Sequence, residues 1–390
     1  MISENRLIGH IKGDPGPCLI MIGGVHGNEP SGVSALQSVC EELKTKELDF
    51  KGNFYALYGN LGALKTEQRF IDVDLNRLWH KKTIDAIKSR TFKVRTAEDQ
   101  ELLKLYHAIR QILDVEKGPF YFIDLHTTSA QTIPFLTVND TLLNRRFTLH
   151  YPAPIILGIE EYIQGPLLSY INELGYVAFG FEGGQHQAKE AFQNHYHFIH
   201  LSMEIIGMKK ADPKSSPHFR QLQLNTKGTK GFYEIVDRFG LKAEDQFEML
   251  GSYQNFECIE KGEHFANYQE QAIEAEKSFQ IFMPLYQSQG SDGYFSIKKI
   301  IPFFLNLSAV LRTWKVDGLL AKLPGIKWYD SEKSALLVNH RIARFFTKQI
   351  FHLLGYRSKI KDQTHWLMYN REYAAKYKAY KSSPWISSVN

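Results

Sequence analysis

Short apolar runs alternate with helical patterns over the first half of the chain. The run from Cys18 to Gly24 is apolar and ends at paired glycines, which is typical of a buried strand. Similar runs occupy residues 54–58, 120–125, 154–157 and 176–181. Helical patterns occupy residues 30–43, 98–114 and 188–208. Strands separated by helices predict an α/β fold, with a parallel or mixed sheet that helices cover on both faces.

The character of the sequence changes near residues 211–217, a polar stretch rich in proline and serine. From there to about residue 310, short strand-like pieces are separated by glycines, which predicts a small β-rich domain. Helical patterns return beyond residue 311, notably over residues 335–354. We therefore predict an α/β domain over residues 1–212, a β-rich domain over 213–310 and a basic helical extension over 311–390.

Charge is distributed unevenly between these parts. Residues 311–390 contain 15 Lys and Arg against 5 Asp and Glu, a net charge of +10. Because the whole chain carries +5, the first 310 residues carry −5. A basic extension of this kind could meet nucleic acid or an anionic surface, but a solvated helical face is the simpler explanation. We therefore expect no nucleic-acid partner.

The cysteines and the N-terminal residues favour a cytoplasmic location. Cys18, Cys40 and Cys258 are widely spaced and form no CxxC pattern, which fits a reducing compartment. The first residues lack the basic region and apolar stretch of a signal peptide. The longest apolar stretch, near residues 301–311, is short and contains Pro302 and Asn306, so we expect no membrane span. The oligomeric state stays open, and a homo-oligomer is compatible with the sequence.

The sharpest chemical signal is the segment Gly-Gly-Val-His-Gly-Asn-Glu-Pro at residues 23–30. It follows a predicted strand and places His26 three positions before Glu29. Imidazole and carboxylate are usual zinc ligands, and a catalytic site takes three protein ligands plus an open position. His126, at the end of another predicted strand, offers the third ligand, and Asp124 can orient a ligand from behind. The His26–Glu29 pair alone, or His126 alone, is more often structural. Their joint appearance at two strand ends favours a metal site.

Arginines and an asparagine between these two motifs can bind an anion. Asn76 and Arg77 can grip a carboxylate through parallel hydrogen bonds. Arg69 can stabilise an oxyanion that forms near a metal. The alternative is a loop salt bridge between these arginines and Asp72 or Asp74.

Glu182 ends an apolar strand and is followed by two glycines. This position suits a base that takes a proton from water at a metal and returns it to a leaving amine. The alternative is that Glu182 caps the helix after the glycines. His195, His197 and His200 follow in that helix but do not share one face, which favours helix packing or a surface patch over a second metal site.

Taken in order, these pieces resemble the succinylglutamate desuccinylase/aspartoacylase family, the deacylase branch of the zinc carboxypeptidase fold. The resemblance is carried by GGVHGNEP, RFIDVDLNR, DLHTTS and FEGG, over roughly residues 17–210. It extends more loosely to MPLYQSQGSDG at residues 283–293. It implies a zinc carboxypeptidase-like mixed sheet flanked by helices, with the β-rich domain partly covering the site.

The resemblance also implies roles for the residues singled out above. One zinc ion per chain would be held by His26, Glu29 and His126, with residues 1–212 as the catalytic domain. Glu182 would be the general base and acid. Arg69 would polarise the scissile carbonyl. The substrate carboxylate would be bound by Asn76 and Arg77.

The implied activity is zinc-dependent removal of a succinyl- or acetyl-type N-acyl group from a small carboxylate-bearing amino acid. Family members acting on acyl-aspartate carry an additional arginine shortly before the catalytic glutamate, but residues 169–181 contain none, which argues against N-acetylaspartate. Thr127 follows the third ligand, where aspartoacylases tend to carry asparagine. The same site would also serve a carboxypeptidase or a peptidase of cell-wall peptides, or persist unused in a binding protein. Tyr286 and Tyr294 could reach over the pocket, although ordinary half-buried positions are more common.

Overall fold

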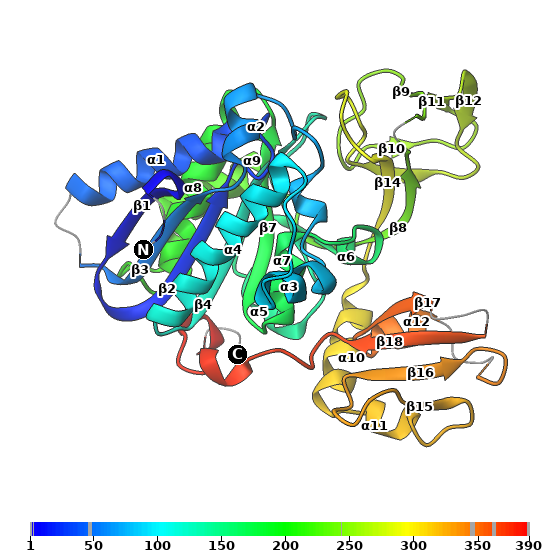
Figure 1. The fold of residues 1–390 in the computed structure, drawn as a ribbon. Coiled ribbons are helices and arrows are strands. Elements are labelled where there is room, and N and C mark those ends of the chain that lie inside the picture. Colours follow the sequence, from blue (N-terminus) through cyan, green and yellow to red (C-terminus); the bar gives the residue numbers. More distant parts are fainter. Residues whose placement is uncertain are drawn as a thin grey trace.

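The computed structural model describes residues 2, 4–45, 49–242, 244–343, 348–360 and 364–387. An eleven-stranded sheet, in the order β1-β3-β2-β4-β7-β5-β6-β8-β14-β13-β10, runs through the molecule (Figure 1). Its strands are β1 (Leu7–Lys12), β2 (Asp14–Gly23), β3 (Lys51–Tyr58), β4 (Phe120–Thr128), β5 (Phe135–Val138), β6 (Pro154–Leu157), β7 (Val177–Gln185), β8 (Gly231–Gly240), β10 (Cys258–Ile259), β13 (Phe279–Phe282) and β14 (Asp292–Lys299).

The sheet is mixed, as predicted. β3, β2, β4 and β7 are parallel neighbours, so their carboxyl ends meet at one edge. β5 is antiparallel to β7 but parallel to β6, and β6 is parallel to β8. β14, β13 and β10 continue the sheet with antiparallel pairs. The predicted α/β class is confirmed, and each of the five predicted strands corresponds to an observed one.

Helices cover both faces of the parallel part of the sheet (Figure 1). α1 (Pro30–Thr45) and α8 (Lys189–Ile205) bury one core together with Leu19 and Met21 of β2. α4 (Ala97–Val115) and α7 (Leu167–Glu173) bury the other, together with Ile20 of β2. Successive strand side chains point to opposite faces, so a strand covered on both faces is apolar throughout.

Short helices complete the first 225 residues. They are η1 (Glu4–Arg6), α2 (Leu61–Thr66), η2 (Leu75–Arg77), α3 (Lys81–Lys88), α5 (Leu142–Thr148), α6 (Ile159–Tyr162), η3 (Pro213–Ser215) and α9 (Pro217–Asn225). α9 packs on α8. Residues 217–225 therefore contact the α/β part of the chain.

The predicted β-rich region extends the large sheet and adds a small one. β8, β14, β13 and β10 lie at the far end of the large sheet. A separate three-stranded sheet consists of β9 (Phe247–Met249), β11 (His264–Tyr268) and β12 (Gln271–Glu274). Its core contains Phe265 and Ile281, and Tyr294 of β14 packs against it.

The C-terminal segment is not purely helical. Its helices are α10 (Pro302–Thr313), α11 (Asp317–Leu320), α12 (Lys348–Leu353), η4 (Tyr377–Tyr380) and α13 (Pro384–Ser387). They accompany a four-stranded antiparallel sheet of β15 (Ile326–Trp328), β16 (Ala335–Asn339), β18 (His365–Asn370) and β17 (Tyr356–Ile360).

The helix predicted over residues 335–354 is wrong in its first part. Residues 335–339 form β16, in which Leu336 and Val338 point into the local core. A short apolar run fits a strand and a buried helix equally well, and here the pairing with β18 decides. Residues 344–347 of the predicted helix lie outside the described part of the chain.

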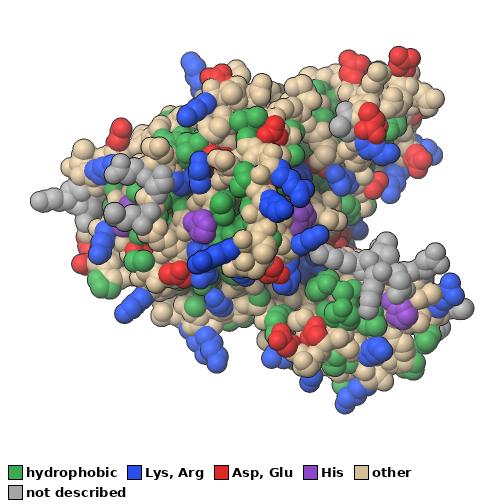
Figure 2. Space-filling view, in the orientation of Figure 1, with side chains coloured by type: hydrophobic (Ala, Val, Ile, Leu, Met, Phe, Trp, Pro, Cys, Tyr) green, Lys and Arg blue, Asp and Glu red, His purple; other side chains and the backbone are tan. Residues whose placement is uncertain are grey.

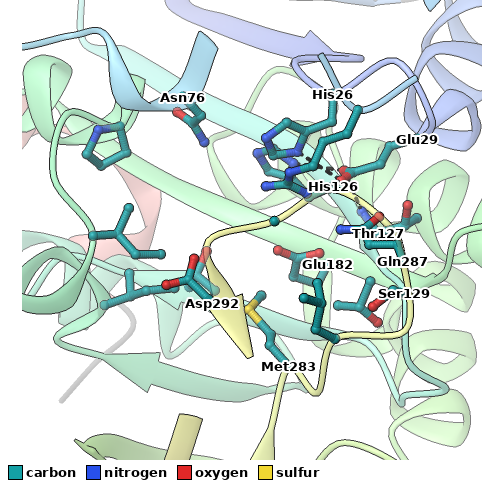
Figure 3. A pocket seen from close by; sticks show the side chains of 18 of the residues that line it. His26, Glu29, Asn76, His126, Thr127, Ser129, Glu182, Met283, Gln287 and Asp292 are labelled. Atoms are coloured by element: carbon teal, nitrogen blue, oxygen red, sulfur yellow. Dashed lines mark hydrogen bonds and ion pairs between the residues drawn. The ribbon is translucent and has the colours of Figure 1, made fainter. Parts of the chain in front are cut away.

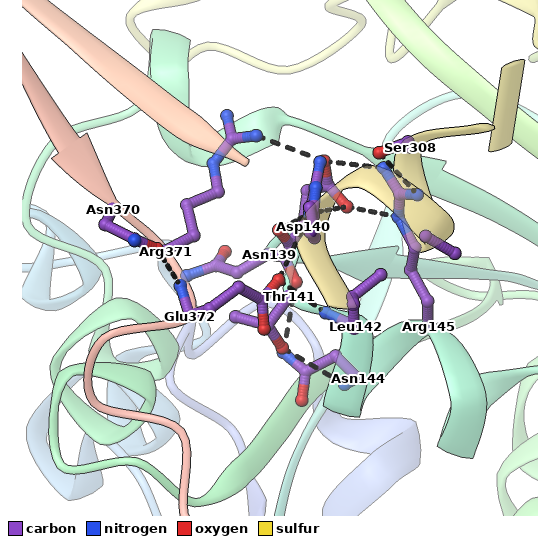
Figure 4. A network of polar contacts seen from close by, with 12 residues as sticks. Asn139, Asp140, Thr141, Leu142, Asn144, Arg145, Ser308, Asn370, Arg371 and Glu372 are labelled. Carbon is purple, nitrogen blue, oxygen red and sulfur yellow. Dashed lines mark hydrogen bonds and ion pairs between the residues drawn. The ribbon is translucent and has the colours of Figure 1, made fainter. Parts of the chain in front are cut away.

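A buried network of charges holds the C-terminal segment against the α/β part (Figure 4). At its centre, Asp140 accepts hydrogen bonds from Arg145 of α5, Arg312 of α10 and Arg371 after β18. Arg312 also lies 3.2 Å from Glu372. Two arginines of the basic extension are therefore buried in ion pairs and do not belong to a solvated helical face.

Figure 2 shows Lys and Arg side chains scattered among acidic and apolar ones on the visible face. No helix in the described ranges combines the length and the apolar character needed to cross a membrane. All three cysteines are free thiols, and Cys18 and Cys40 are buried.

Candidate metal centre and active site

The three residues predicted to bind a metal meet at the carboxyl ends of β2 and β4 (Figure 3). His26 follows β2, Glu29 directly precedes α1, and His126 lies on β4; all three are buried. One ligand atom from each lies within 4.8 Å of the others. The Nδ1 atoms of His26 and His126 each lie 2.9 Å from a different oxygen of Glu29. This set of donors can hold one divalent cation.

Two aspartates contact the Nε2 atoms of the histidines, on the side of each ring that faces away from Glu29. Nε2 of His126 lies 2.7 Å from Asp124 Oδ2, and Nε2 of His26 lies 3.1 Å from Asp74 Oδ1. An Nε2 that donates its proton to an aspartate leaves the Nδ1 lone pair facing Glu29, as a metal ligand requires. Burial opposes the charged form of His126, but Asp124 and Glu29 outweigh it and raise its pKa well above the usual value. A cation between the Nδ1 atoms balances these carboxylates, so the residues fit a metal.

Glu182 lies on β7 directly opposite His126 of β4, and its side chain lines the same cavity (Figure 3). Its Oε2 is buried and has no hydrogen-bond partner among the described residues. Burial, reinforced by Glu29 and Asp124, raises its pKa to about 8 although His126 acts in the opposite direction. Glu182 does not cap α8, because that helix begins at Lys189. Its carboxyl group can therefore exchange a proton with a molecule in the cavity.

The first glycine after Glu182 lets β7 approach α8. A Cβ atom on Gly183 would lie 2.5 Å from the His195 ring. His195 Nε2 is 3.1 Å from the backbone oxygen of His126, so this ring supports the strand that carries the third ligand. Burial lowers the pKa of His195 to about 4, which keeps the ring neutral. His195 is buried and its ring packs edge-on against Phe181 of β7, so it is not part of a surface patch.

Arg69 lies beside the ligand cluster. Its Nη2 is 3.2 Å from Asp74 Oδ2, and its Nη1 is 3.6 Å from Glu29 Oε1. The predicted alternative of a salt bridge to Asp74 is therefore present. It does not remove Arg69 from the cavity, which the side chain lines. Its Nε is buried without a partner in the part of the chain that the structure describes.

Asn76 and Arg77 line the cavity next to this arginine. Asn76 Oδ1 accepts a hydrogen bond from the backbone N–H of Leu167 at 2.8 Å. Arg77 Nη2 donates to Asp292 Oδ2 at 3.1 Å, and Asp292 also contacts Arg238. The structure thus brings all seven predicted site residues to one cavity, with Asp292 as an additional acidic group in its wall.

Comparison with known proteins identifies the region that carries these motifs. Residues 15–190 match the succinylglutamate desuccinylase/aspartoacylase catalytic domain. This region belongs to that family. A succinylglutamate desuccinylase from Photorhabdus laumondii is 28% identical over 122 residues, which cover 31% of this chain and 36% of that protein. The aligned part thus spans about a third of that relative's length.

Solved structures of the desuccinylase/aspartoacylase family share the fold over a longer stretch. A succinylglutamate desuccinylase from Vibrio cholerae matches with a TM-score of 0.56 and 16% identity, over 73% of this chain and 82% of the other. A succinylglutamate desuccinylase/aspartoacylase from Rhodobacter sphaeroides matches with a TM-score of 0.56 and 15% identity, over 75% and 88%. The shared fold therefore reaches beyond residues 15–190.

A loop beyond the region matched to the desuccinylase/aspartoacylase family lies over the cavity. Gln287 Oε1 accepts from Asn28 Nδ2 at 2.8 Å and lies 3.1 Å from His186 Nε2. The backbone N–H of Tyr286 donates to Ser129 Oγ at 3.1 Å. These contacts tie the loop to the segments that follow β2, β4 and β7.

Sequence reasoning assigned no role to His186, Gln287 or Asp292, although all three line the cavity. The available signal was their position, since His186 lies two residues after FEGG and the other two lie inside MPLYQSQGSDG. Neither Tyr286 nor Tyr294 lines the cavity. Tyr294 stacks on Phe239 instead.

Proposed function

We propose that this chain is a zinc-dependent amidohydrolase that removes a succinyl- or acetyl-type N-acyl group from a small carboxylate-bearing amino acid. The observation that carries the proposal is the cluster of His26, Glu29 and His126 with Glu182 facing the same cavity. The names of the desuccinylase relatives support the reaction class. One zinc ion per chain fits the two imidazoles and one carboxylate.

Four side chains of the cavity have a role in this reaction besides the metal ligands. Zinc supplies Lewis-acid chemistry that activates water and polarises a carbonyl. Glu182 takes the proton of the attacking water and delivers it to the leaving amine. Arg69 stabilises the carbonyl oxygen as it gains negative charge. Asn76 and Arg77 bind the substrate carboxylate, with Arg77 giving up part of its contact with Asp292.

The loop that carries Tyr286 and Gln287 favours a small substrate over a peptide. Gln287 contacts both Asn28 and His186, so the loop that carries it crosses the cavity between these two segments. The space left between the side chains is about 140 Å³, which suits a small molecule. A carboxypeptidase or cell-wall peptidase would need this loop to open.

Metal removal and substrate screening test the proposal. The purified full chain should contain close to one zinc per chain, lose activity on N-succinyl and N-acetyl amino acids after chelation, and regain it with zinc. Release of free amine is the measurement. Turnover that survives complete removal of metal would refute the metal role. A chain that binds no zinc and hydrolyses none of these compounds would instead favour a binding protein.

We also propose a cytoplasmic location. The support is that Cys18, Cys40 and Cys258 are free, as expected in a reducing compartment. Alkylation of the three thiols in intact cells, read by mass spectrometry, checks this directly. An oxidised Cys258, the exposed thiol, would contradict it.

A further inference from the structure

The cavity has two chemically different sides. In Figure 3, Asn76 and Asp292 lie on one side of Glu182, and Thr127 and Gln287 lie on the other. The side of Thr127 and Gln287 presents hydroxyl, amide and imidazole groups. Most of the apolar lining of the cavity comes from a different set of residues: Ile159, Ile163, Pro166, Leu168, Met283 and Phe295.

We call these six residues the apolar wall, and four of them belong to one hydrophobic cluster. Ile159, Ile163 and Met283 pack against a cluster that contains Phe295. They are only partly buried, so they expose apolar surface to the cavity. Burying such surface against an apolar ligand group is favourable, at about 25 cal/mol per Å².

The apolar wall lies directly beside Asn76 and Arg77. The backbone N–H of Leu167 donates to Asn76 Oδ1 at 2.8 Å. The chain at Gly165 passes so close to Arg77 that a Cβ atom there would lie 2.5 Å from the Arg77 backbone oxygen. Gly165 also has φ +72°, a conformation that glycine adopts without strain. The wall and the proposed carboxylate-binding pair therefore form one surface.

We infer that this apolar wall binds the side chain of the substrate amino acid, so that the substrates are N-acylated apolar amino acids of about the size of leucine, methionine or phenylalanine. The inference rests on the proposed function. One carbon atom of an amino acid carries both its carboxylate and its side chain. A carboxylate bound at Asn76 and Arg77 therefore places the side chain against the wall, while the acyl group extends toward Thr127 and Gln287.

An acidic side chain fits this side of the cavity poorly. It would lose its water against the aliphatic carbons of the wall, which is costly. Thr137 and Asn139, which also line the cavity, would replace only part of that hydration. Of the two arginines that line the cavity, Arg69 already faces Asp74, and Arg77 is taken by the α-carboxylate of the substrate in the proposed function.

The wall is held in place before any ligand binds. Arg238 Nη1 donates to the backbone oxygen of Tyr162 at 3.1 Å, and the Tyr162 hydroxyl donates to Val236 O at 3.1 Å. Arg371 forms ion pairs with Glu160 and Glu161 of the same short helix, α6. A preformed apolar surface selects among side chains more sharply than one that must be ordered by the ligand.

Substrate preference tests the inference. We expect the zinc-loaded full chain to hydrolyse N-acetyl-L-leucine with a kcat/KM about 100-fold or more above that for N-acetyl-L-aspartate. Ile163→Arg should lower the leucine value and raise the aspartate value, so the ratio falls by about 10-fold or more. Ile301→Arg is the matched control, because Ile301 is exposed and outside the cavity. It should leave the ratio unchanged.

A second variant covers the case in which Ile163→Arg does not fold. Ile163→Ala shortens a side chain of the wall and so enlarges the cavity without adding charge. It should shift the substrate preference from leucine toward phenylalanine. Calorimetric titration with free L-leucine and free L-aspartate gives a readout that does not depend on turnover. Leucine should bind more tightly than aspartate.

The outcomes separate this inference from the proposed function. Faster hydrolysis of the aspartate compound would overturn the inference and leave the amidohydrolase activity standing. No turnover of either compound, with leucine bound more tightly than aspartate, would refute the activity but support the apolar wall. No turnover and no preference in binding would overturn both.

Discussion

Asp140 and Glu182 are both buried carboxyl groups, with 6% and 5% of their surfaces exposed, yet their pKa values shift in opposite directions. Burial disfavours ionised Asp140, but Arg145, Arg312 and Arg371 outweigh it and hold its pKa well below the usual value. Glu182 has a raised pKa of about 8, caused mainly by burial. Its Oε2 has no hydrogen-bond partner in the described ranges.

The charges around Asp140 stabilise the fold, whereas we expect those around Glu182 to interact with a bound ion or substrate. Around Asp140, carboxylates and guanidinium groups face each other in nearly equal number (Figure 4). Around Glu182, the carboxylates of Glu29 and Asp124 face the His126 ring and one guanidinium group, that of Arg69, and none of these hydrogen-bonds the Glu182 Oε2 atom. Uncompensated buried charge is costly, so it persists where a bound ion or substrate supplies the missing charge.

The largest effect is expected from Glu182→Gln. If Glu182 moves protons, kcat should fall by about 100- to 10,000-fold, because the amide can neither accept nor return a proton. Zinc content should be unchanged, since the three ligand residues remain. The free energy of unfolding should be unchanged or higher, because a buried ionisable group without a full set of partners is removed. Steady-state kinetics, metal analysis and urea unfolding measure the three quantities.

Near-normal kcat with zinc retained would eliminate Glu182 as the base. Gln185→Glu serves as a control for charge near the end of β7, because Gln185 is exposed and does not line the cavity. It should leave kcat within a few-fold of the original.

Asp140→Asn should have the opposite profile, with a large loss of stability and zinc binding preserved. Removing the shared carboxylate leaves Arg145, Arg312 and Arg371 without their common partner. Breaking a buried pair of this kind costs about 3–5 kcal/mol. Asp85→Asn is the matched control, since Asp85 pairs with Lys81 at 2.6 Å on the exposed surface. Solvent screens that exposed pair, so its loss should change stability far less. Equal losses of stability in the two variants would mean that the buried network stabilises the fold no more than an exposed ion pair does.

The same contrast explains what the sequence could predict. His26, Glu29 and His126 lie at or near the ends of strands with long apolar runs. The hydrophobic pattern and the position of each residue after a predicted strand were therefore enough to predict that they meet. Glu182 was found in the same way. These residues are positioned by local structure plus parallel pairing, which a single sequence reveals well.

The Asp140 cluster could not be predicted, because its members lie in different parts of the chain. Arg312 and Arg371 are 172 and 231 positions from Asp140, and nothing in their neighbours marks them as buried. A basic segment was therefore attributed to a solvated helix. The strand β16 was not predicted for a related reason. Only its pairing with β18 distinguishes the short apolar run around Leu336 from a helix.

Asp124→Asn should produce a smaller effect that is confined to the metal cluster. Asn retains the shape but weakens the contact that orients His126 through Nε2. Loss of such a contact lowers metal affinity by about 10- to 100-fold. Competition with a chromogenic chelator measures this. The substitution removes a fully buried charge, so stability without zinc should not fall in the same proportion. Unchanged zinc affinity would mean that the backbone alone fixes the ligand.

The smallest effect is a change in how stability depends on pH. The folded-state pKa of Asp140 is depressed, so its contribution is present above the unfolded value of about 3.9 and is lost as the pH falls through the folded value. The difference in urea midpoint between the original chain and Asp140→Asn should therefore stay constant from about pH 5 to 8 and narrow below about pH 4. Zinc-free protein avoids acid release of metal from the other cluster. A gap that stays the same down to pH 3 would mean that Asp140 contributes by packing, because a group that contributes through ionisation loses that contribution when it is protonated.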